Sequence, residues 1–197
     1  QGPSFCAGGD LGWMQDQMAG DAAMKRAAAQ SIAQMLGAIN TLPQPVIGRL
    51  QGNAFGGGIG MACVCDVAIA VDTARFGLTE TKLGLIPATI GPYVLARMGE
   101  AHARRVFMSG RLFDADGAVA LGVVARAVPE DAIDAAVAAG VAAAKAVARS
   151  LGPTIDESVI ARSIDALIAQ WEGRSAKEGI SAFFERRKPD WAVTRAP

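Results

Sequence analysis

A run of glycines is the part of this sequence whose residue types and spacing could do chemistry. Four of the five positions in Gly56-Gly57-Gly58-Ile59-Gly60 are glycine, and an apolar stretch with helical character follows. Glycine lets the backbone approach a ligand closely, and the first N–H groups of a helix have no partner inside the helix. The run could therefore hold an enolate or a tetrahedral oxyanion with backbone N–H groups. The residues alone leave open the alternative that the glycines serve close packing of a helix on a strand.

Three other kinds of site do not fit the run. A dinucleotide fingerprint, G-x-G-x-x-G, needs a third glycine where Met61 stands. A phosphate-binding P-loop ends in Gly-Lys and Ser or Thr, and a nucleophile elbow has a central serine; the run has neither. The one histidine, His102, falls in an expected surface helix, which argues against a Ser-His-Asp triad.

The composition is that of a globular chain with no strong electrostatic preference. Of 197 residues, 51% are hydrophobic, and 19 Lys and Arg balance 19 Asp and Glu. A net charge of zero gives no reason to expect nucleic acid or a membrane as a partner. Three cysteines, Cys6, Cys63 and Cys65, are interpreted as reduced, buried thiols, and no metal site is expected because zinc needs four spaced ligands. We find no signal peptide and no apolar run long enough to span a bilayer, so the expected location is cytoplasmic.

The elements expected to position the glycine run form a strand–helix–strand unit. Val46–Leu50 and Val67–Val71 have the apolar character of buried strands, and Gly57–Cys65 lies between them as a helix. Strands on either side of a helix pair in parallel. The sequence therefore predicts a βαβ unit with the glycine run at the start of its helix.

The rest of the chain is mostly helical, so the predicted fold class is α/β with a helical C-terminal region. Aspartates at positions 21, 114 and 156 stand where helix N-caps belong. The predicted helices are Asp21–Asn40, Pro87–Met98, Glu100–Met108, Ala115–Leu121, Glu130–Leu151 with an interruption at Gly140, Asp156–Gln170, and the aromatic and basic tail "EGISAFFERRKPDW"; Arg75–Thr81 is a short strand or loop and Val123–Val128 a strand.

Four segments of the chain together resemble the enoyl-CoA hydratase/isomerase (crotonase) superfamily. They are "FCAGGDL", "PVIGRLQGNAFGGGIGMACVCDVAIA", "ARFGLTETKLGLIPATIGPYVLARMGEAHARRVFMSGRLFDADGAVALGVVARAV" and "EGISAFFERRKPDW". The resemblance covers nearly the whole chain. It implies a crotonase-like spiral of ββα turns over residues 1–128, followed by a helical trimerisation region over residues 129–197. It also leads us to expect that the family's first strands, and a longer connection near Gly140, are missing from this sequence.

The resemblance implies a site for acyl-CoA thioesters. In the family, two backbone N–H groups hold the thioester oxygen, and these correspond to Gly9 and Gly57; the general acid/base corresponds to Glu80. Hydratases of the family usually carry another glutamate at the position of Gly60, so this sequence keeps one of the two carboxylates. Further substrate-binding residues implied by the resemblance are Ala7, Gly8, Gly56, Gly60, Phe184 and Lys188. No cofactor is implied, because coenzyme A is part of the substrate.

Three activities are compatible with the resemblance. The segments look most like the methylglutaconyl-CoA and isohexenylglutaconyl-CoA hydratase branch, whose members add water to a 2-enoyl-CoA. A Δ3,Δ2-enoyl-CoA isomerase, which needs only the glutamate at position 80, is the alternative. A non-catalytic acyl-CoA-binding protein is an alternative of another class. The partner in each case is an acyl-CoA thioester, and the family implies a homotrimer or a hexamer built as a dimer of trimers.

Four charged residues have expected environments. Asp10 reads as a helix cap, and Asp66 is expected to have a buried partner, because a carboxylate at a helix C-terminus is otherwise unfavourable. Lys82 is interpreted as a salt bridge or a solvated charge in preference to a contact with a substrate carboxylate. Burial in an acyl pocket should raise the pKa of Glu80, as a general base requires.

Overall fold

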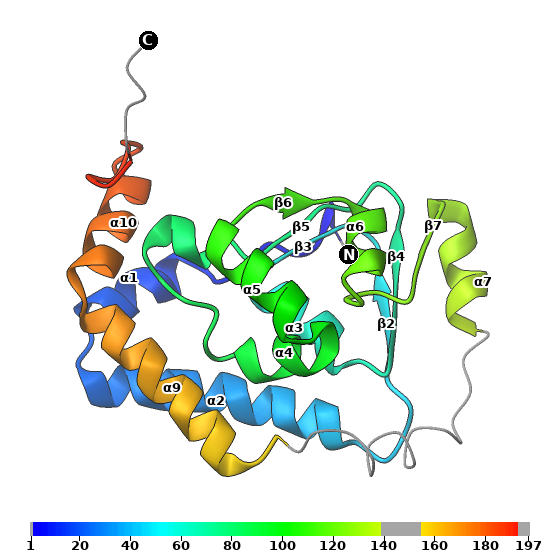
Figure 1. Cartoon of the computed structure of the whole chain (residues 1–197), viewed down its shortest axis with the longest axis horizontal. Helices are drawn as coiled ribbons and strands as arrows, with labels where there is room; N and C mark the ends of the chain where they lie inside the picture. The colour runs from blue at the N-terminus through cyan, green and yellow to red at the C-terminus, as the bar shows by residue number, and fades with distance from the viewer. Residues whose placement is uncertain (1, 139–154, 193–197) are drawn as a thin grey trace.

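The computed structural model describes residues 2–138 and 155–192, and its strands form two sheets. One sheet has the order β1-β3-β5-β6 and the other the order β2-β4-β7 (Figure 1). The strands are β1 (Ser4–Cys6), β2 (Ile47–Leu50), β3 (Asn53–Phe55), β4 (Val67–Val71), β5 (Phe76–Gly77), β6 (Leu112–Phe113) and β7 (Arg126–Val128).

The chain alternates between the two sheets as it winds. It leaves β2 for β3 in the other sheet, passes through helix α3 (Gly57–Val64), and returns to β4 beside β2. The predicted parallel pairing is confirmed, with Ile47 opposite Val67 and Leu50 opposite Ala70. The simple βαβ prediction was wrong in one respect, because β3 intervenes and pairs with β1 and β5. The result is a spiral of ββα turns, the predicted fold class.

Helix α3 is the centre of the core. Its residues are apolar on all sides, and a helix of this kind is stable only when other elements surround it. Ile59, Ala62 and Val64 are at most 1% exposed. Asp66, just after this helix, accepts a hydrogen bond from the backbone N–H of Val46 at 2.7 Å, which is the partner that its unfavourable position at a helix end required.

A layer of helices covers one end of the spiral. The helices α1 (Leu11–Ala19) and α2 (Ala22–Thr41) begin at the caps Asp10 and Asp21, each of which accepts a backbone N–H at 2.8 Å. Helix α9 (Glu157–Glu172) packs along α2, and α10 (Arg174–Phe184) follows it beside α1 (Figure 1). An apolar cluster joins α2 to α9 and consists of Ala29, Ala33, Ile164 and Ile168.

Six further helical segments complete the secondary structure of the described residues. They are η1 (Glu80–Leu83), α4 (Gly91–Met98), α5 (Glu100–Ser109), α6 (Ala115–Ala120), η2 (Glu130–Ala132) and α7 (Ile133–Ala138). The prediction that α4 begins at Pro87 was wrong by four residues: Pro92 lies in its first turn, where a missing N–H costs nothing. The predicted strand over 123–128 is confined to its last three residues.

The tail was also predicted to be more helical than it is. Helix α10 ends at Phe184, and the chain then turns at Arg186, whose φ of 55° lies in the left-handed region. Pro189 further disfavours helix in the residue before it. The later part of the helix predicted over 130–151, including Gly140, lies outside the described residues. No helix within 2–138 and 155–192 is long and apolar enough to cross a membrane.

Candidate active site

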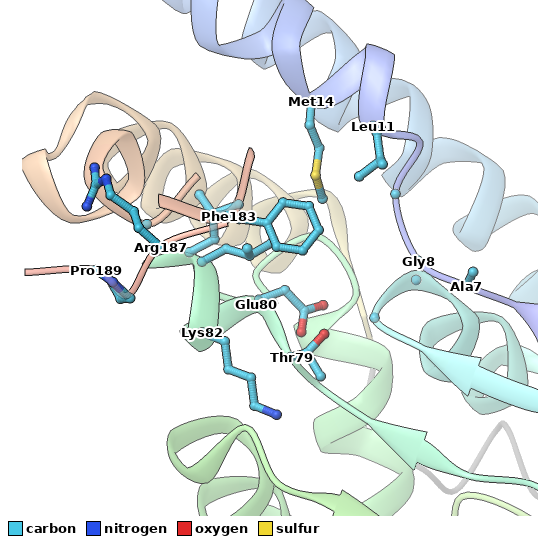
Figure 2. A pocket seen from close by; sticks show the side chains of 16 residues that line it. Ala7, Gly8, Leu11, Met14, Thr79, Glu80, Lys82, Phe183, Arg187 and Pro189 are labelled. Atoms are coloured by element: carbon cyan, nitrogen blue, oxygen red, sulfur yellow. The ribbon is translucent and has the colours of Figure 1, made fainter. Parts of the chain in front are cut away.

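A cavity of roughly 400 Å³ lies where the loop after β1, the start of α3, the turn η1 and the end of α10 meet (Figure 2). Most of its lining is apolar or glycine. The lining residues are Ala7, Gly8, Gly9, Leu11, Met14, Gly56, Gly57, Thr79, Glu80, Lys82, Leu83, Leu85, Gly179, Phe183, Arg187 and Pro189.

Two glycine N–H groups belong to this lining. Gly9 ends the loop between β1 and the cap of α1, and Gly57 is the first residue of α3. Within the described part of the chain, neither backbone N–H donates a hydrogen bond. A side chain at position 57 would meet nothing within 4 Å, so this helix terminus is open to the cavity. The pair can supply two donors to an oxygen bound there.

The turn at Gly56 is what brings the glycine run to the cavity. Gly56 has a φ of 49°, a conformation that glycine adopts at no steric cost. Its N–H donates to the carbonyl of Gly77 on β5 at 3.0 Å. A Cβ at position 56 would lie 3.1 Å from Glu80 Oε1, so glycine here also leaves room for the carboxylate.

Glu80 places a carboxylate in the same cavity. It begins η1, directly after the segment that continues β5, and in Figure 2 its carboxylate lies beside Thr79 and points toward the loop of Ala7 and Gly8. Its Oε2 atom is buried and has no hydrogen-bond partner among the described residues. Burial raises the pKa of Glu80 from 4.5 to about 7, and a backbone hydrogen bond opposes that rise. A carboxyl group of this pKa can give or take a proton near neutral pH.

Gly60 does not line the cavity. It is buried one turn into α3, and a Cβ there would lie 2.4 Å from Ile90 Cγ2 and 2.8 Å from Ile90 Cβ. Ile90, which precedes α4, therefore fills the space that a side chain at position 60 would need. Among the described lining residues, Glu80 is the one carboxylate.

The C-terminal segment brings to the cavity the direct sequence neighbours of Phe184 and Lys188. Phe184 packs into the cluster of Leu85, Trp171, Ala176 and Ile180, and Lys188 lies outside the lining. Phe183 lines the cavity in place of Phe184.

Arg187 lines the cavity in place of Lys188. Gly179 and Phe183 are four residues apart on α10 and share one helix face, and this spacing was the signal that could have identified the lining face; Arg187 follows the turn at Arg186 and lies outside the helix. Leu11 and Thr79 were likewise not singled out as lining residues, and no sequence motif marks them.

The two cations of the lining have different surroundings. Arg187 donates two hydrogen bonds to Glu178, at 2.5 and 2.8 Å, and one to Glu185 at 2.5 Å. Lys82 is exposed, and in the described part of the chain no carboxylate lies within 4 Å of its amine. No group of three or more His, Cys, Asp or Glu residues among those described is arranged to hold a metal ion.

Comparisons with known proteins find enoyl-CoA hydratases and their family. The family model described as enoyl-CoA hydratase/isomerase matches residues 1–194. An Alternaria alternata protein, enoyl-CoA hydratase ACTT6, is 38% identical over 136 residues, which are 68% of this chain and 44% of that protein. The chain therefore spans less than half the length of this relative.

Solved structures give the same result over nearly the whole chain. The crystal structure of an enoyl-CoA hydratase from Shewanella pealeana is 35% identical, with a TM-score of 0.71, covering 97% of this chain and 76% of that one. An enoyl-CoA hydratase from Mycobacterium avium is 29% identical, with a TM-score of 0.78 and the same coverage of 97% and 76%.

Proposed function

The chain belongs to the enoyl-CoA hydratase/isomerase family, and from this membership we propose that it adds water across the Cα=Cβ bond of a 2-enoyl-CoA thioester. Hydratase-type enzyme activity is supported at the level of the family. The observation that carries the proposal is the geometry of Glu80, a buried carboxylate without a hydrogen-bond partner in the described residues, in one cavity with two free glycine N–H groups.

The proposed mechanism uses these three groups. The thioester oxygen accepts hydrogen bonds from the N–H groups of Gly9 and Gly57, which stabilise the enolate that develops there; each donor is worth about 3 to 4 kcal/mol in the transition state. Ionised Glu80 takes a proton from water as the water oxygen bonds to Cβ. The same carboxyl group then returns the proton to Cα, which restores the thioester carbonyl and leaves Glu80 ionised. A pKa of about 7 makes both transfers accessible.

The proposed substrate class is a 2-enoyl-CoA of the methylglutaconyl type, whose acyl group carries a free carboxylate at the end away from the thioester. The support is the resemblance of "GGGIGMACVCD" and "LTETKLGLIPATIGPY" to that branch, in which glycine in place of the first glutamate is familiar. The close packing of Ile90 on Gly60, which leaves no room for a glutamate side chain there, is compatible with that branch.

Loss of the enoyl-thioester absorbance tests the proposal. The purified chain should consume crotonyl-CoA or 3-methylglutaconyl-CoA, and mass spectrometry should find a product heavier by one water. Glu80→Gln should lose about 10²- to 10⁴-fold in kcat. A matched control, Glu100→Gln, changes an exposed glutamate outside the cavity. Turnover of neither substrate, with binding intact, would refute the hydratase; if 3-enoyl-CoAs were not converted either, a non-catalytic acyl-CoA-binding protein would be favoured.

One observation favours a second candidate, a Δ3,Δ2-enoyl-CoA isomerase. Glu80 is the single carboxylate among the described lining residues, and moving a proton from Cα to Cγ needs only one shuttle. A 3-enoyl-CoA substrate would then gain the 2-enoyl absorbance with no change in mass. Measuring both reactions on one preparation decides between hydration and isomerisation.

The proposals on oligomeric state, cellular location and cofactor rest on the same resemblance. We propose a homotrimer or a dimer of trimers that uses the helical region over 129–197, a cytoplasmic location, and no cofactor beyond the coenzyme A of the substrate. Light scattering after size-exclusion chromatography measures the assembly, and a monomer at micromolar concentration would contradict it.

A further inference from the structure

We propose that Lys82 binds an anionic group of the thioester ligand, and so helps to determine which thioesters the cavity accepts. The inference rests on the proposed function and deepens it. Lys82 lies two residues after Glu80 on the turn η1 and lines the same cavity. In Figure 2 its side chain extends away from the Glu80 carboxylate.

The stem of Lys82 lies beside Gly110, and its amine has no ion-pair partner among the described residues. Its Cγ and Cε atoms lie 3.4 and 3.6 Å from the position of a Cβ on Gly110. Gly110 ends α5 with a φ of 55°, so no side chain covers the lysine stem there. With no carboxylate of the described residues within ion-pair distance, the amine is available to an anionic group of a ligand.

The other cation of the lining cannot play this part as easily. Two carboxylates, Glu178 and Glu185, already take hydrogen bonds from the guanidinium of Arg187. An anion that approached Arg187 would meet these two negative charges. Lys82 is therefore the cation best able to attract one, because opposite charges at short range attract most strongly when neither is already paired.

Two parts of a thioester ligand could supply the anion. One is a carboxylate at the far end of the acyl group, and the other is a phosphate of coenzyme A. A lysine ammonium is a compact charge that accepts either. Either would place an anionic oxygen within about 9 Å of the Lys82 Cα, because the extended side chain spans about 6 Å to Nζ and a hydrogen bond adds about 3 Å.

Kinetics of Lys82→Met on three substrates test the proposal and separate the two sources. The substrates are crotonyl-CoA, 3-methylglutaconyl-CoA and crotonyl-pantetheine, which lacks the nucleotide. We expect KM to rise about fivefold for at least one CoA thioester, with little change in kcat. A rise confined to 3-methylglutaconyl-CoA assigns the acyl carboxylate, whereas a rise for both CoA thioesters but not for crotonyl-pantetheine assigns a phosphate.

Controls distinguish this effect from a general loss of charge or of fold. Lys177→Met removes an exposed lysine that does not line the cavity and should leave KM unchanged. Lys82→Arg should recover most of the affinity, and the difference between wild type and Lys82→Met should shrink as salt is added. Equal KM values for wild type and Lys82→Met on all three substrates would overturn the proposal.

Direct binding keeps the inference separate from the proposed function. Titration calorimetry with the same thioesters gives Kd without turnover. If wild type binds but converts none of them, the proposed function fails while the Kd of Lys82→Met still tests Lys82. Equal Kd values for the two proteins would then overturn the inference alone.

Discussion

Replacing Glu80 with glutamine should change the way in which stability depends on pH. Burial raises the pKa of this carboxyl group from 4.5 to about 7 in the folded chain. Between these two values the folded state holds a proton that the unfolded state has released, so the free energy of unfolding falls as the pH rises. At about 1.4 kcal/mol per pKa unit, the full loss is about 3 kcal/mol and is complete above pH about 7. Below pH about 4.5 both states are protonated and the loss vanishes.

Glutamine cannot ionise, so Glu80→Gln should escape this loss. The unfolding free energy of the variant minus that of wild type should move by about 3 kcal/mol in favour of the variant between pH about 4 and pH about 8. For a chain of this size that corresponds to a relative shift in Tm of about 6 to 12 °C. Urea unfolding at several pH values measures the difference, with Glu100→Gln as the reference for an ordinary replacement.

A difference that stays constant across this pH range would refute the reasoning. It would mean that water reaches the Glu80 carboxylate and that its charged form costs nothing in the fold. The same variant should have lost its activity. Ionised Glu80 therefore lowers the stability of the fold while it is needed for catalysis.

Three further predictions concern the packing of α3, the reaction and the cavity wall. Gly60→Ala should lower the free energy of unfolding by about 1 to 3 kcal/mol, because its methyl group would lie 2.4 Å from Ile90 Cγ2; chemical denaturation measures this, and an unchanged midpoint would mean that the two segments separate easily. The value of kcat/KM should rise about tenfold per pH unit up to pH about 7 and then level off, since water activation needs ionised Glu80; an initial rate that does not change over this range would exclude Glu80 as the base. Glu178→Gln should raise KM more than it lowers kcat, because the Glu178 carboxylate holds Arg187 in the cavity wall. Equal KM values for the variant and wild type would show that Arg187 keeps its position without this carboxylate.

Much of the helical structure could be predicted because its signals are local. Asp21, Asp114 and Asp156 each cap the helix that follows, as expected from their positions. Strand β3 was not predicted, because it has only three residues and its partners lie far away in the sequence. Its pairing of Ala54 with Phe76 joins residues 22 positions apart, and no local pattern encodes such a contact.

The site could be predicted where backbone requirements restrict the residue type. Gly9, Gly57 and Glu80 were named from their motifs, and the structure brings all three to one cavity. The helix face that α10 presents could not be fixed by composition, since Phe183 and Phe184 are neighbours of one type and only the helix rotation places one of them in the lining. The contact of Ile90 with Gly60 is likewise a result of tertiary packing.

That contact also limits the order in which this site could change over generations. A carboxylate at position 60 cannot arise through a change at Gly60 alone, because its Cβ would lie 2.4 Å from Ile90 Cγ2 and 2.8 Å from Ile90 Cβ. Shrinking Ile90 to alanine first would remove only the nearer atom, so the two backbones would have to separate as well. Each intermediate would be less stable than the present chain. A carboxylate at position 60 could therefore arise only through intermediates that fold less stably than the present chain.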